Sequence, residues 1–410
     1  MKLCRYLPVP SDRMGVLWSL LPIENSVILE YGPAGTTHYS MGLFNELGLG
    51  QRNRLFTTHM SEADVVMGDT SRLEKALVEI DQQYKPQVIF VLASTISAVI
   101  GTDLRGVCAY MQKKVNAQLV VFPQIGFSGD YSTGLQSAYQ ALAEQLAEAD
   151  QPRIPGTYNL LGVSEGAYRM RSDVNEIKWM MHKAFGMRSN VCLCEETSVE
   201  KIRRMGGAEV NLVLREEALS AAQILEKRCG TPYVLGAPYG YTGSLNWLQS
   251  VGTLVGRPIE PALQSRIEEQ TGKVREYRRT AATLKRDKPC AVLYGEYPAV
   301  EGLSAFMKEL GISVSKAMVC HSLRAYSAPS PDVQYLPQEQ ERMSIMQTLH
   351  HTFVLADDVS RRHIASDNTY LRISMPVIDG AQIATHLPLM GVRGADAILE
   401  TVEAYFQTLR

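Results

Sequence analysis

Short hydrophobic runs recur along the chain, and each is followed by a turn and then by a longer stretch with apolar residues at helical spacing. Continuous runs rich in Val, Ile and Leu are typical of strands buried on both faces of a parallel sheet. The runs lie at residues 27–29, 88–92, 119–122, 158–163, 190–194, 210–214, 233–235, 290–295, 314–319, 353–356 and 370–374. Alternation of such strands with helices predicts an α/β fold with three Rossmann-like domains, each a mostly parallel sheet flanked by helices.

Two breaks in this pattern divide the chain. Residues 150–156 contain two prolines and a glycine, which end any helix and indicate a linker. Residues 260–286 form a long charged stretch, which predicts a solvent-exposed connecting helix and not a binding patch. We therefore expect domains at residues 1–152, 156–286 and 287–410, the last closing with a helix at 394–409.

Composition excludes several classes of protein. With 410 residues, 45% of them hydrophobic and 20% charged, the chain can bury substantial cores and is not generally disordered. Its 41 Lys and Arg against 43 Asp and Glu give no basic field, so we expect no nucleic-acid partner. No apolar run approaches the roughly 18 residues that span a bilayer, and the first residues lack the apolar region of a signal peptide. We expect a cytoplasmic protein with no membrane contact, whose seven irregularly spaced cysteines are compatible with reduced thiols.

No residue pattern defines an active site by itself. Glycine turns at 32–35, 126–129 and 295–296 match neither a dinucleotide fingerprint nor a phosphate loop, and they are better explained as chain turns. Cys192 and Cys194 share one face of a predicted strand, so they could bind a metal with two further ligands or simply pack as buried thiols. Other candidate metal ligands, each explained as well by a structural role, are Cys320, His321, His350, His351 and His363.

Several segments, in order along the whole chain, resemble the nitrogenase component 1 family, which includes nitrogenase subunits, cofactor-assembly scaffolds and tetrapyrrole reductases. Residues 29–36 (LEYGPAGT) resemble the family turn "HGPxGC", residues 56–68 resemble "STxMxExDxVFGG", and residues 91–104 resemble "VxSTCxxExIGDDL". Further similarity lies in the glycines at 126–134, in residues 159–162, and in residues 291–311, which resemble "GDxxxxxGLxxFLxELG". Together they identify a β-type member of the family.

The resemblance implies an iron-sulfur cluster of the 4Fe-4S type at a subunit interface, which the family holds with thiolates from three segments. Here the matching positions are Ser11, Thr36, which follows Gly35, and Thr95, so all three thiols are replaced by hydroxyls. A hydroxyl is a hard ligand for a soft iron-sulfide core. We therefore expect the partner subunit to hold the cluster. Cys4 is close enough to Ser11 in sequence to be a displaced ligand, or else a thiol near a flexible terminus.

A second family site, the large metallocluster of the catalytic α-type subunit, uses a Cys just after a strand of the second domain. The matching position here is Arg215, so the resemblance implies no catalytic cofactor in this chain. Residues 373–379 with Gly391 and Gly394 are more similar to the β-type subunit, and we assign the nearby His386 to structure.

These departures favour one function and leave two alternatives open. The first is a β-like, non-catalytic subunit of a nitrogenase-like reductase, an oxidoreductase in which catalysis is centred on an α-like partner in a heterodimer or α2β2 complex. An ATP-dependent iron-sulfur reductase would deliver electrons to it. The alternatives are a cluster-free scaffold or assembly protein that binds a metallocluster precursor or a tetrapyrrole, and a homodimeric tetrapyrrole reductase. The identity of the substrate cannot be inferred from the residues.

Overall fold

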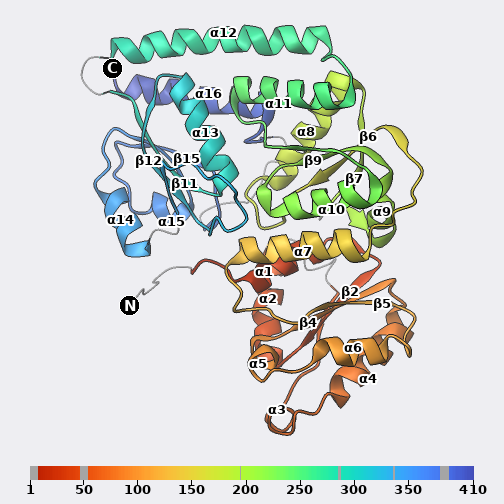
Figure 1. The fold of residues 1–410 in the computed structure, drawn as a ribbon. Helices are drawn as coiled ribbons and strands as arrows, with labels where there is room; N and C mark the ends of the chain where they lie inside the picture. The colour runs from red at the N-terminus through yellow and green to blue at the C-terminus, as the bar shows by residue number, and fades with distance from the viewer. Residues whose placement is uncertain (1–7, 47–53, 194, 285–287, 336–337, 379–386) are drawn as a thin grey trace.

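The computed structural model describes residues 8–46, 54–193, 195–284, 288–335, 338–378 and 387–410. These residues form three parallel sheets flanked by helices (Figure 1), so the predicted α/β fold class is confirmed. The N-terminal sheet has the order β3 (Leu55–Thr57), β2 (Ser26–Tyr31), β4 (Val88–Ala93), β5 (Gln118–Phe122). The middle sheet has the order β10 (Tyr233–Leu235), β9 (Ala208–Val213), β6 (Ile154–Leu161), β7 (Arg188–Cys192).

The C-terminal sheet has the order β13 (Val333–Tyr335), β12 (Ser313–Val319), β11 (Cys290–Gly295), β14 (Phe353–Ala356), β15 (Thr369–Arg372). A short pairing of β1 (Ile23–Glu24) with β8 (Thr197–Ser198) joins the first and second thirds of the chain. All of these strand pairs are parallel, as continuous apolar runs predict. The domain boundaries at 152–156 and 286–287 stay a prediction.

Helices connect the strands and cover the sheets. In the first third they are α1 (Asp12–Leu20), α2 (Ala34–Glu46), α3 (Glu62–Met67), α4 (Ser71–Tyr84), α5 (Thr95–Val99), α6 (Leu104–Met111) and α7 (Tyr131–Gln145). The middle third has α8 (Met170–Phe185), α9 (Val199–Arg203), α10 (Leu219–Cys229), α11 (Gly240–Val255) and α12 (Pro261–Thr283). The last third has α13 (Tyr297–Glu309), α14 (Glu339–Gln347), α15 (Asp358–Arg361) and α16 (Gly391–Thr408). No helix in the described ranges is both long and apolar enough to cross a membrane.

Helix α12 is exposed to solvent along most of its length, as the charged stretch at residues 260–286 predicts. In α12 only four of 23 residues are buried, namely Leu263, Ile267, Val274 and Ala281. It runs along the outside of the molecule above α11 and α16 (Figure 1). Its charged side chains therefore form a solvated face.

Helices α1 and α7 form a layer between the N-terminal sheet and the rest of the molecule (Figure 1). Their backbones touch, because a Cβ added to Gly134 would lie 1.8 Å from the carbonyl oxygen of Asp12, and one added to Gly15 would lie 2.0 Å from that of Tyr131. One hydrophobic core, including Leu17, Leu135 and Leu225, extends through this layer from β4 to α10. The N-terminal and middle sheets are therefore held together by shared apolar packing.

Candidate functional site

The three residues that the resemblance predicts at cluster-ligand positions lie at one edge of the N-terminal sheet. Thr36 lies in α2, after the carboxyl end of β2, and Thr95 is the first residue of α5, after the carboxyl end of β4. Ser11 is the N-cap residue of α1 and pairs with Asp130 in an isolated antiparallel bridge. Because the strands are parallel, their carboxyl ends meet at the same edge.

The loop after β5 joins the segments of Ser11 and Thr95. The carboxylate of Asp12 accepts hydrogen bonds from the backbone N–H groups of Gly126 (2.8 Å) and Ser128 (3.1 Å). Gly126 has a φ of 99°, and a Cβ there would lie 2.4 Å from Cγ2 of Thr95. Only glycine fits this close approach. The structure thus brings the Ser11 and Thr95 segments against the same loop.

A buried ion pair joins the Ser11 segment to that of Thr36. The guanidinium of Arg13 donates to both carboxylate oxygens of Glu30, at 2.9 and 2.6 Å, and to the hydroxyl of Ser40 at 2.6 Å. The side chain of Arg13 is 9% exposed and that of Glu30 1%. Glu30 also accepts from Thr37 (2.6 Å) and, more weakly, from Thr36 (3.4 Å). This bidentate pair with supporting hydroxyls is the geometry in which a buried ion pair is well satisfied.

The pairing of Arg13 with Glu30 was not predicted from the sequence. One signal was available, because Glu30 is a charged residue that directly follows the apolar run at 27–29, and it lies in β2, whose six residues are all buried. A carboxylate in such a strand requires a partner.

The residues of this edge do not fit an iron-sulfur cluster held by this chain. The hydroxyls of Ser11, Thr36 and Thr95 are hard donors, and Thr36 already donates to the carbonyl oxygen of Pro33 at 3.2 Å. The cysteines in the described part of the chain, Cys108, Cys192, Cys229, Cys290 and Cys320, all lie outside the segments that form this edge. Among the same described residues no group of three or more His, Cys, Asp or Glu side chains could hold a metal ion.

The two remaining predicted positions add little to the site. Gly35 is exposed, and a Cβ there would meet nothing within 4 Å, so packing does not require glycine. Cys4 lies outside the described residues, as do Cys194 and His386.

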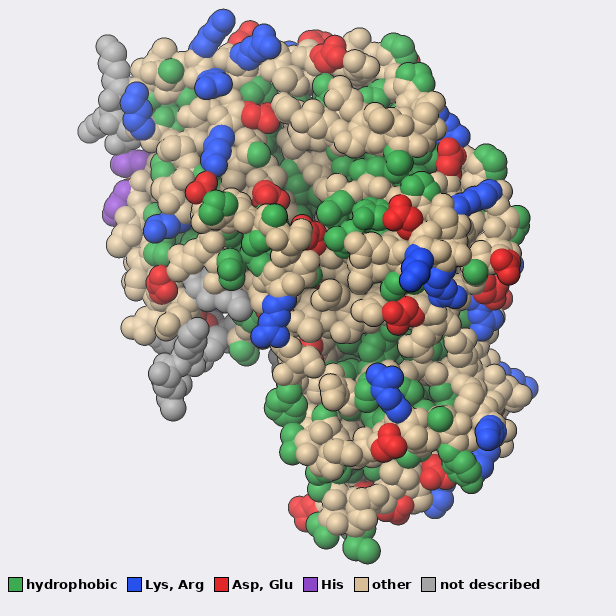
Figure 2. Space-filling model, viewed as in Figure 1, with side chains coloured by type: hydrophobic (Ala, Val, Ile, Leu, Met, Phe, Trp, Pro, Cys, Tyr) green, Lys and Arg blue, Asp and Glu red, His purple; other side chains and the backbone are tan. Residues whose placement is uncertain are grey.

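Exposed apolar side chains lie in the helices and loops that follow the carboxyl ends of the strands of the N-terminal sheet. Val66 and Met67 at the end of α3, Val99 in α5 and Phe127 in the loop after β5 are between 70% and 81% exposed. Three further apolar side chains are less exposed, at 37% to 38%, namely Met41, Ile96 and Ile100. Figure 2 shows hydrophobic side chains along the rim of the lobe formed by the N-terminal sheet. We call these seven residues the apolar rim.

Arg215, which the resemblance predicts at the position of the family's cofactor Cys, is buried between the middle and C-terminal sheets. Its Nε donates to Glu217 at 3.2 Å, and its Nη2 lies 3.5 Å from a carboxylate oxygen of Glu296. Burial alone would lower the pKa of Arg215, but the carboxylates of Glu217 and Glu296 outweigh it and raise that pKa. Burial likewise opposes ionisation of Glu217, and the charge of Arg215 outweighs it and lowers the pKa of Glu217. Both groups are therefore charged.

Cys320 and His321, beside this junction, have structural roles. Nε2 of His321 accepts from the backbone N–H of Tyr297 at 3.1 Å, and Nδ1 lies 2.9 Å from the carbonyl oxygen of Ser322. Both ring nitrogens of His321 therefore have partners within the protein. The Cys320 sulfur lies 3.2 Å from the Tyr131 hydroxyl, and burial raises the pKa of its thiol to about 12, so it stays protonated.

The other histidine candidates lie at the surface of the C-terminal unit. His350 is exposed, and its Nδ1 lies 2.8 Å from a carboxylate oxygen of Asp367. His351 is 3.9 Å from the same carboxylate. Two exposed rings and one carboxylate make an exposed ion pair and no closed set of ligands.

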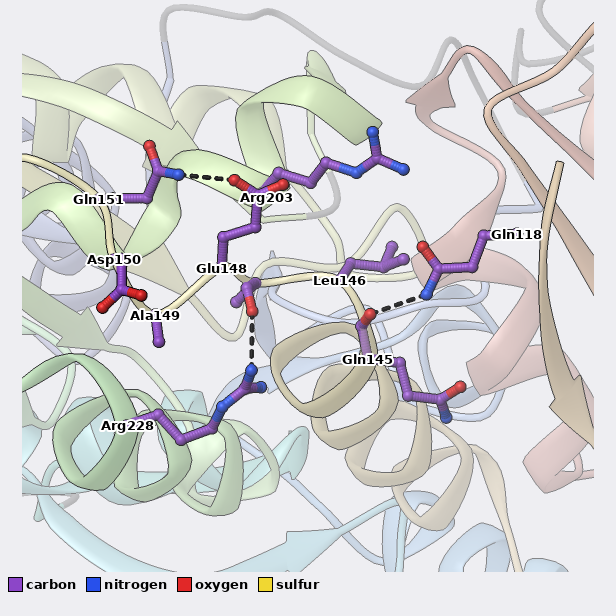
Figure 3. Close-up of a pocket in the computed structure, with 10 residues that line it drawn as sticks. Gln118, Gln145, Leu146, Glu148, Ala149, Asp150, Gln151, Arg203 and Arg228 are labelled. Carbon is purple, nitrogen blue, oxygen red and sulfur yellow. Dashed lines mark hydrogen bonds between the residues drawn. The ribbon is translucent and has the colours of Figure 1, made fainter. Parts of the chain in front are cut away.

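A groove about 520 Å³ in volume lies at the opposite edge of the N-terminal sheet (Figure 3). Arg228 donates from its guanidinium to the carbonyl oxygens of Ala143, Glu144 and Ala147, at 2.6 to 3.1 Å. Gln118 donates to the carbonyl oxygen of Gln145 at 2.8 Å. These polar side chains cap the end of α7 and join the chain segments, so the groove is structural.

The arrangement of three parallel sheets around a buried junction defines a class of multi-sheet α/β proteins. Among solved structures, "Nitrogenase Cp1 at pH 6.5" has this fold, with a TM-score of 0.79 and 17% identity over 99% of this chain and 94% of that one. Residues 11–406 match the family described as nitrogenase component 1 type oxidoreductase. The chain therefore belongs to this family, as the resemblance predicted.

Two curated relatives illustrate the range of the family. The chain is 28% identical to the nitrogenase iron-molybdenum cofactor biosynthesis protein NifE of Nostoc sp., over 62% of this chain and 52% of that protein. It is 24% identical to one subunit of the light-independent protochlorophyllide reductase of Heliobacterium modesticaldum, over 72% of this chain and 60% of that protein. The matched region thus spans between about half and two thirds of the length of these relatives.

Proposed function

We propose that this chain is a β-like, non-catalytic subunit of a nitrogenase-type reductase complex. A related α-like subunit, in a heterodimer or an α2β2 assembly, would supply the sulfur ligands and the substrate site. The observation that carries the proposal is the edge of the N-terminal sheet. The segments of Ser11, Thr36 and Thr95 lie in contact there, carry hydroxyls where the resemblance implies thiols, and belong to the same lobe as the apolar rim.

The apolar rim supports a protein partner at this edge. Exposed apolar side chains scattered singly are normal, whereas their concentration at one edge is typical of an interaction surface. Val99 and Phe127 stand beside Thr95 and the Gly126 loop, so a partner that covers them would also cover the hydroxyl positions.

A cluster of the 4Fe-4S type held by the partner would then face a surface of this chain made of hydroxyls, backbone and apolar groups. Such a surface excludes water and offers hydrogen bonds, and both properties affect a cluster's potential. In this proposal the contribution of the chain is shielding, while every iron ligand comes from the partner.

The end of α3 is proposed to contribute to docking of an ATP-dependent iron-sulfur reductase. The helix is fixed at its start by a capping box between Ser61 and Asp64, and Asp64 also pairs with Arg72 at 2.7 Å. Val66 and Met67 at its other end are the most exposed members of the apolar rim. A rigid helix that presents two apolar side chains suits contact with a transient partner.

The proposal is tested by co-expressing the full chain with an α-like subunit encoded beside it and measuring the native mass of the purified assembly. We expect a complex that contains both chains, and reductase activity only when both are present with the ATP-dependent reductase. A chain that stays monomeric in the presence of that subunit contradicts the proposal. A stable homodimer that is active alone instead supports the homodimeric tetrapyrrole reductase.

A scaffold or assembly protein is the second candidate, because relatives of the chain include proteins named for cofactor biosynthesis. The two functions differ in what the complex does with a cluster. A scaffold complex releases a bound metallocluster precursor to an acceptor protein without turnover, whereas a reductase complex consumes ATP and electrons while its cluster stays bound. Measuring metal transfer and ATP-dependent turnover on one preparation distinguishes them.

A further inference from the structure

The middle and C-terminal sheets meet at a small cavity near the carboxyl ends of β6, β9 and β11. Its walls include Ser164, Asp173, Arg215, Tyr239 and Glu296, and its volume is about 50 Å³. A pocket for a drug-sized ligand usually measures about 300 to 1,000 Å³. A tetrapyrrole or a large metallocluster is at least that size, so this cavity has room for a few water molecules and no larger group.

The side chain of Arg215 forms part of the wall of this cavity. It is 3% exposed and packs against Gly162, where an added Cβ would lie 2.7 Å from Cγ of Arg215. The two carboxylates that pair with it come from different sheets, because Glu217 follows β9 and Glu296 follows β11. Removing the charge of Arg215 would leave these two carboxylates without their cation, one fully buried and the other 22% exposed.

Two tyrosines extend the charge cluster to the rest of the molecule. Tyr326, in the C-terminal unit, donates to Glu217 at 2.8 Å and is itself buried. Tyr131, the first residue of α7, donates to Glu296 at 3.3 Å. The middle sheet, the C-terminal sheet and the α1–α7 layer therefore all contribute a residue to one hydrogen-bonded group.

We infer that Arg215, Glu217, Glu296, Tyr131 and Tyr326 form a lock that closes the junction and takes the place of a bound cofactor. The chain then carries neither a metallocluster nor a tetrapyrrole between its sheets. If the second candidate function holds, any such cargo lies on the partner subunit. The inference concerns the chain by itself and does not depend on the proposed pairing.

Hydrogen exchange measured by mass spectrometry on the full chain tests the lock. The reporters are the backbone segments 214–218, 294–300 and 321–327, which lie on the two sides of the junction. Arg215→Ala removes the charge that pairs both carboxylates, and losing one partner of a buried pair corresponds to roughly a 100-fold or greater change in an opening equilibrium. We expect exchange to accelerate by that factor in all three segments together.

The control is Arg257→Ala, which removes a half-exposed ion pair with Glu209 in the same middle unit. It should leave exchange in the three segments within a few fold of the unmodified chain. If Arg215→Ala does not fold, Tyr326→Phe keeps every charge and removes one hydrogen bond, and we expect roughly tenfold faster exchange in the same segments. Acceleration confined to 214–218 in either variant overturns the lock.

Zinc protoporphyrin tests the absence of a cofactor site. Added to the unmodified chain, it should leave exchange in the three segments unchanged, because the closed junction does not admit it. Stoichiometric porphyrin binding that slows exchange in all three segments would overturn the inference, whatever assembly the chain forms.

Discussion

Replacing Arg13 by Met removes the cation that pairs with Glu30 at the edge of the N-terminal sheet. The change keeps an unbranched side chain in α1 and deletes three hydrogen bonds, two to Glu30 at 2.9 and 2.6 Å and one to Ser40 at 2.6 Å. The carboxylate of Glu30 stays buried at 1% exposure, with hydroxyls of Thr36 and Thr37 as its remaining side-chain donors. The folded state then contains an unpaired buried charge.

The size of the effect follows from burial. Removing one partner of a buried pair costs about 3 to 5 kcal/mol, because the other charge loses its compensation. The bond from Thr37, at 2.6 Å, stabilises the remaining carboxylate, so we expect a value near the lower limit, about 3 kcal/mol. The double change Arg13→Met with Glu30→Leu removes both charges and should recover most of this loss.

Urea unfolding followed by the fluorescence of Trp18 measures the effect where it occurs. Trp18 lies in α1, the same helix as Arg13, and Trp179→Phe with Trp247→Phe removes the other indoles from the signal. The matched control is Lys273→Met, which breaks an exposed i,i+4 pair with Glu269 and should cost below about 1 kcal/mol. A metal chelator should leave the unfolding midpoint of the unmodified chain unchanged.

Two results would refute this reasoning. The first is a loss below about 1 kcal/mol for Arg13→Met, equal to that of the exposed control. The second is a double variant as unstable as the single one, since the cost would then come from lost packing and not from the unpaired charge.

Three further predictions concern Asp173, which accepts hydrogen bonds from the backbone N–H groups of Leu389 and Met390 just before α16, the apolar rim, and the α1–α7 crossing. Burial raises the pKa of Asp173 from 3.8 to about 7, so the folded chain binds a proton that the unfolded chain has released, and stability falls as pH rises from about 4 to 7. Asp173→Asn should flatten this pH dependence in urea titrations and should raise the free energy of unfolding at pH 8 by at most about 4 kcal/mol. Val99→Lys should weaken binding to the α-like subunit at least tenfold without changing the unfolding of the chain alone, whereas Leu254→Lys on α11 should change neither. Equal affinities of the two variants for the α-like subunit in a titration would exclude Val99 from the interface. Gly134→Ala places a Cβ 1.8 Å from a backbone oxygen of α1 and should lower the free energy of unfolding by about 1 to 3 kcal/mol. The control Gly243→Ala has open space around the added Cβ and should raise the free energy of unfolding by up to about 1 kcal/mol. Similar effects of the two variants would contradict the close crossing.

The strands were predictable because continuous apolar runs mark parallel strands covered on both faces. The run at 88–92 lies within β4, all six residues of which are buried. Helix α12 was predictable from its charges for the complementary reason, since it faces solvent along most of its length.

Helix α1 was not predicted, because all nine of its residues are buried. A helix enclosed on every side has no polar face, so its sequence lacks the helical period that reveals an amphipathic helix. The end of α7 at Gln145 was not predicted either, and there Arg228 from α10 donates hydrogen bonds to the last carbonyl groups. That contact arises only in the folded chain.

The sequence located the segments of the candidate site but not the interactions within it. Similarity to the family indicated that Ser11, Thr36 and Thr95 belong to one place, and the structure puts their segments in contact. The pairing of Arg13 with Glu30 depends on how α1 lies against β2, and no local pattern specifies which buried charges will meet. The closure of the junction by Arg215 likewise requires the middle and C-terminal sheets to be in place.

Iron content tests the central claim most directly, namely that the chain lacks sulfur ligands of its own and depends on a partner for them. The chain purified alone under anaerobic conditions and the complex with the α-like subunit are compared, each with and without the triple change Ser11→Ala, Thr36→Ala and Thr95→Ala. We predict no bound iron in the chain alone, and iron in the complex that the triple change leaves at full stoichiometry. Stoichiometric iron in the chain alone that disappears with the triple change would contradict the account.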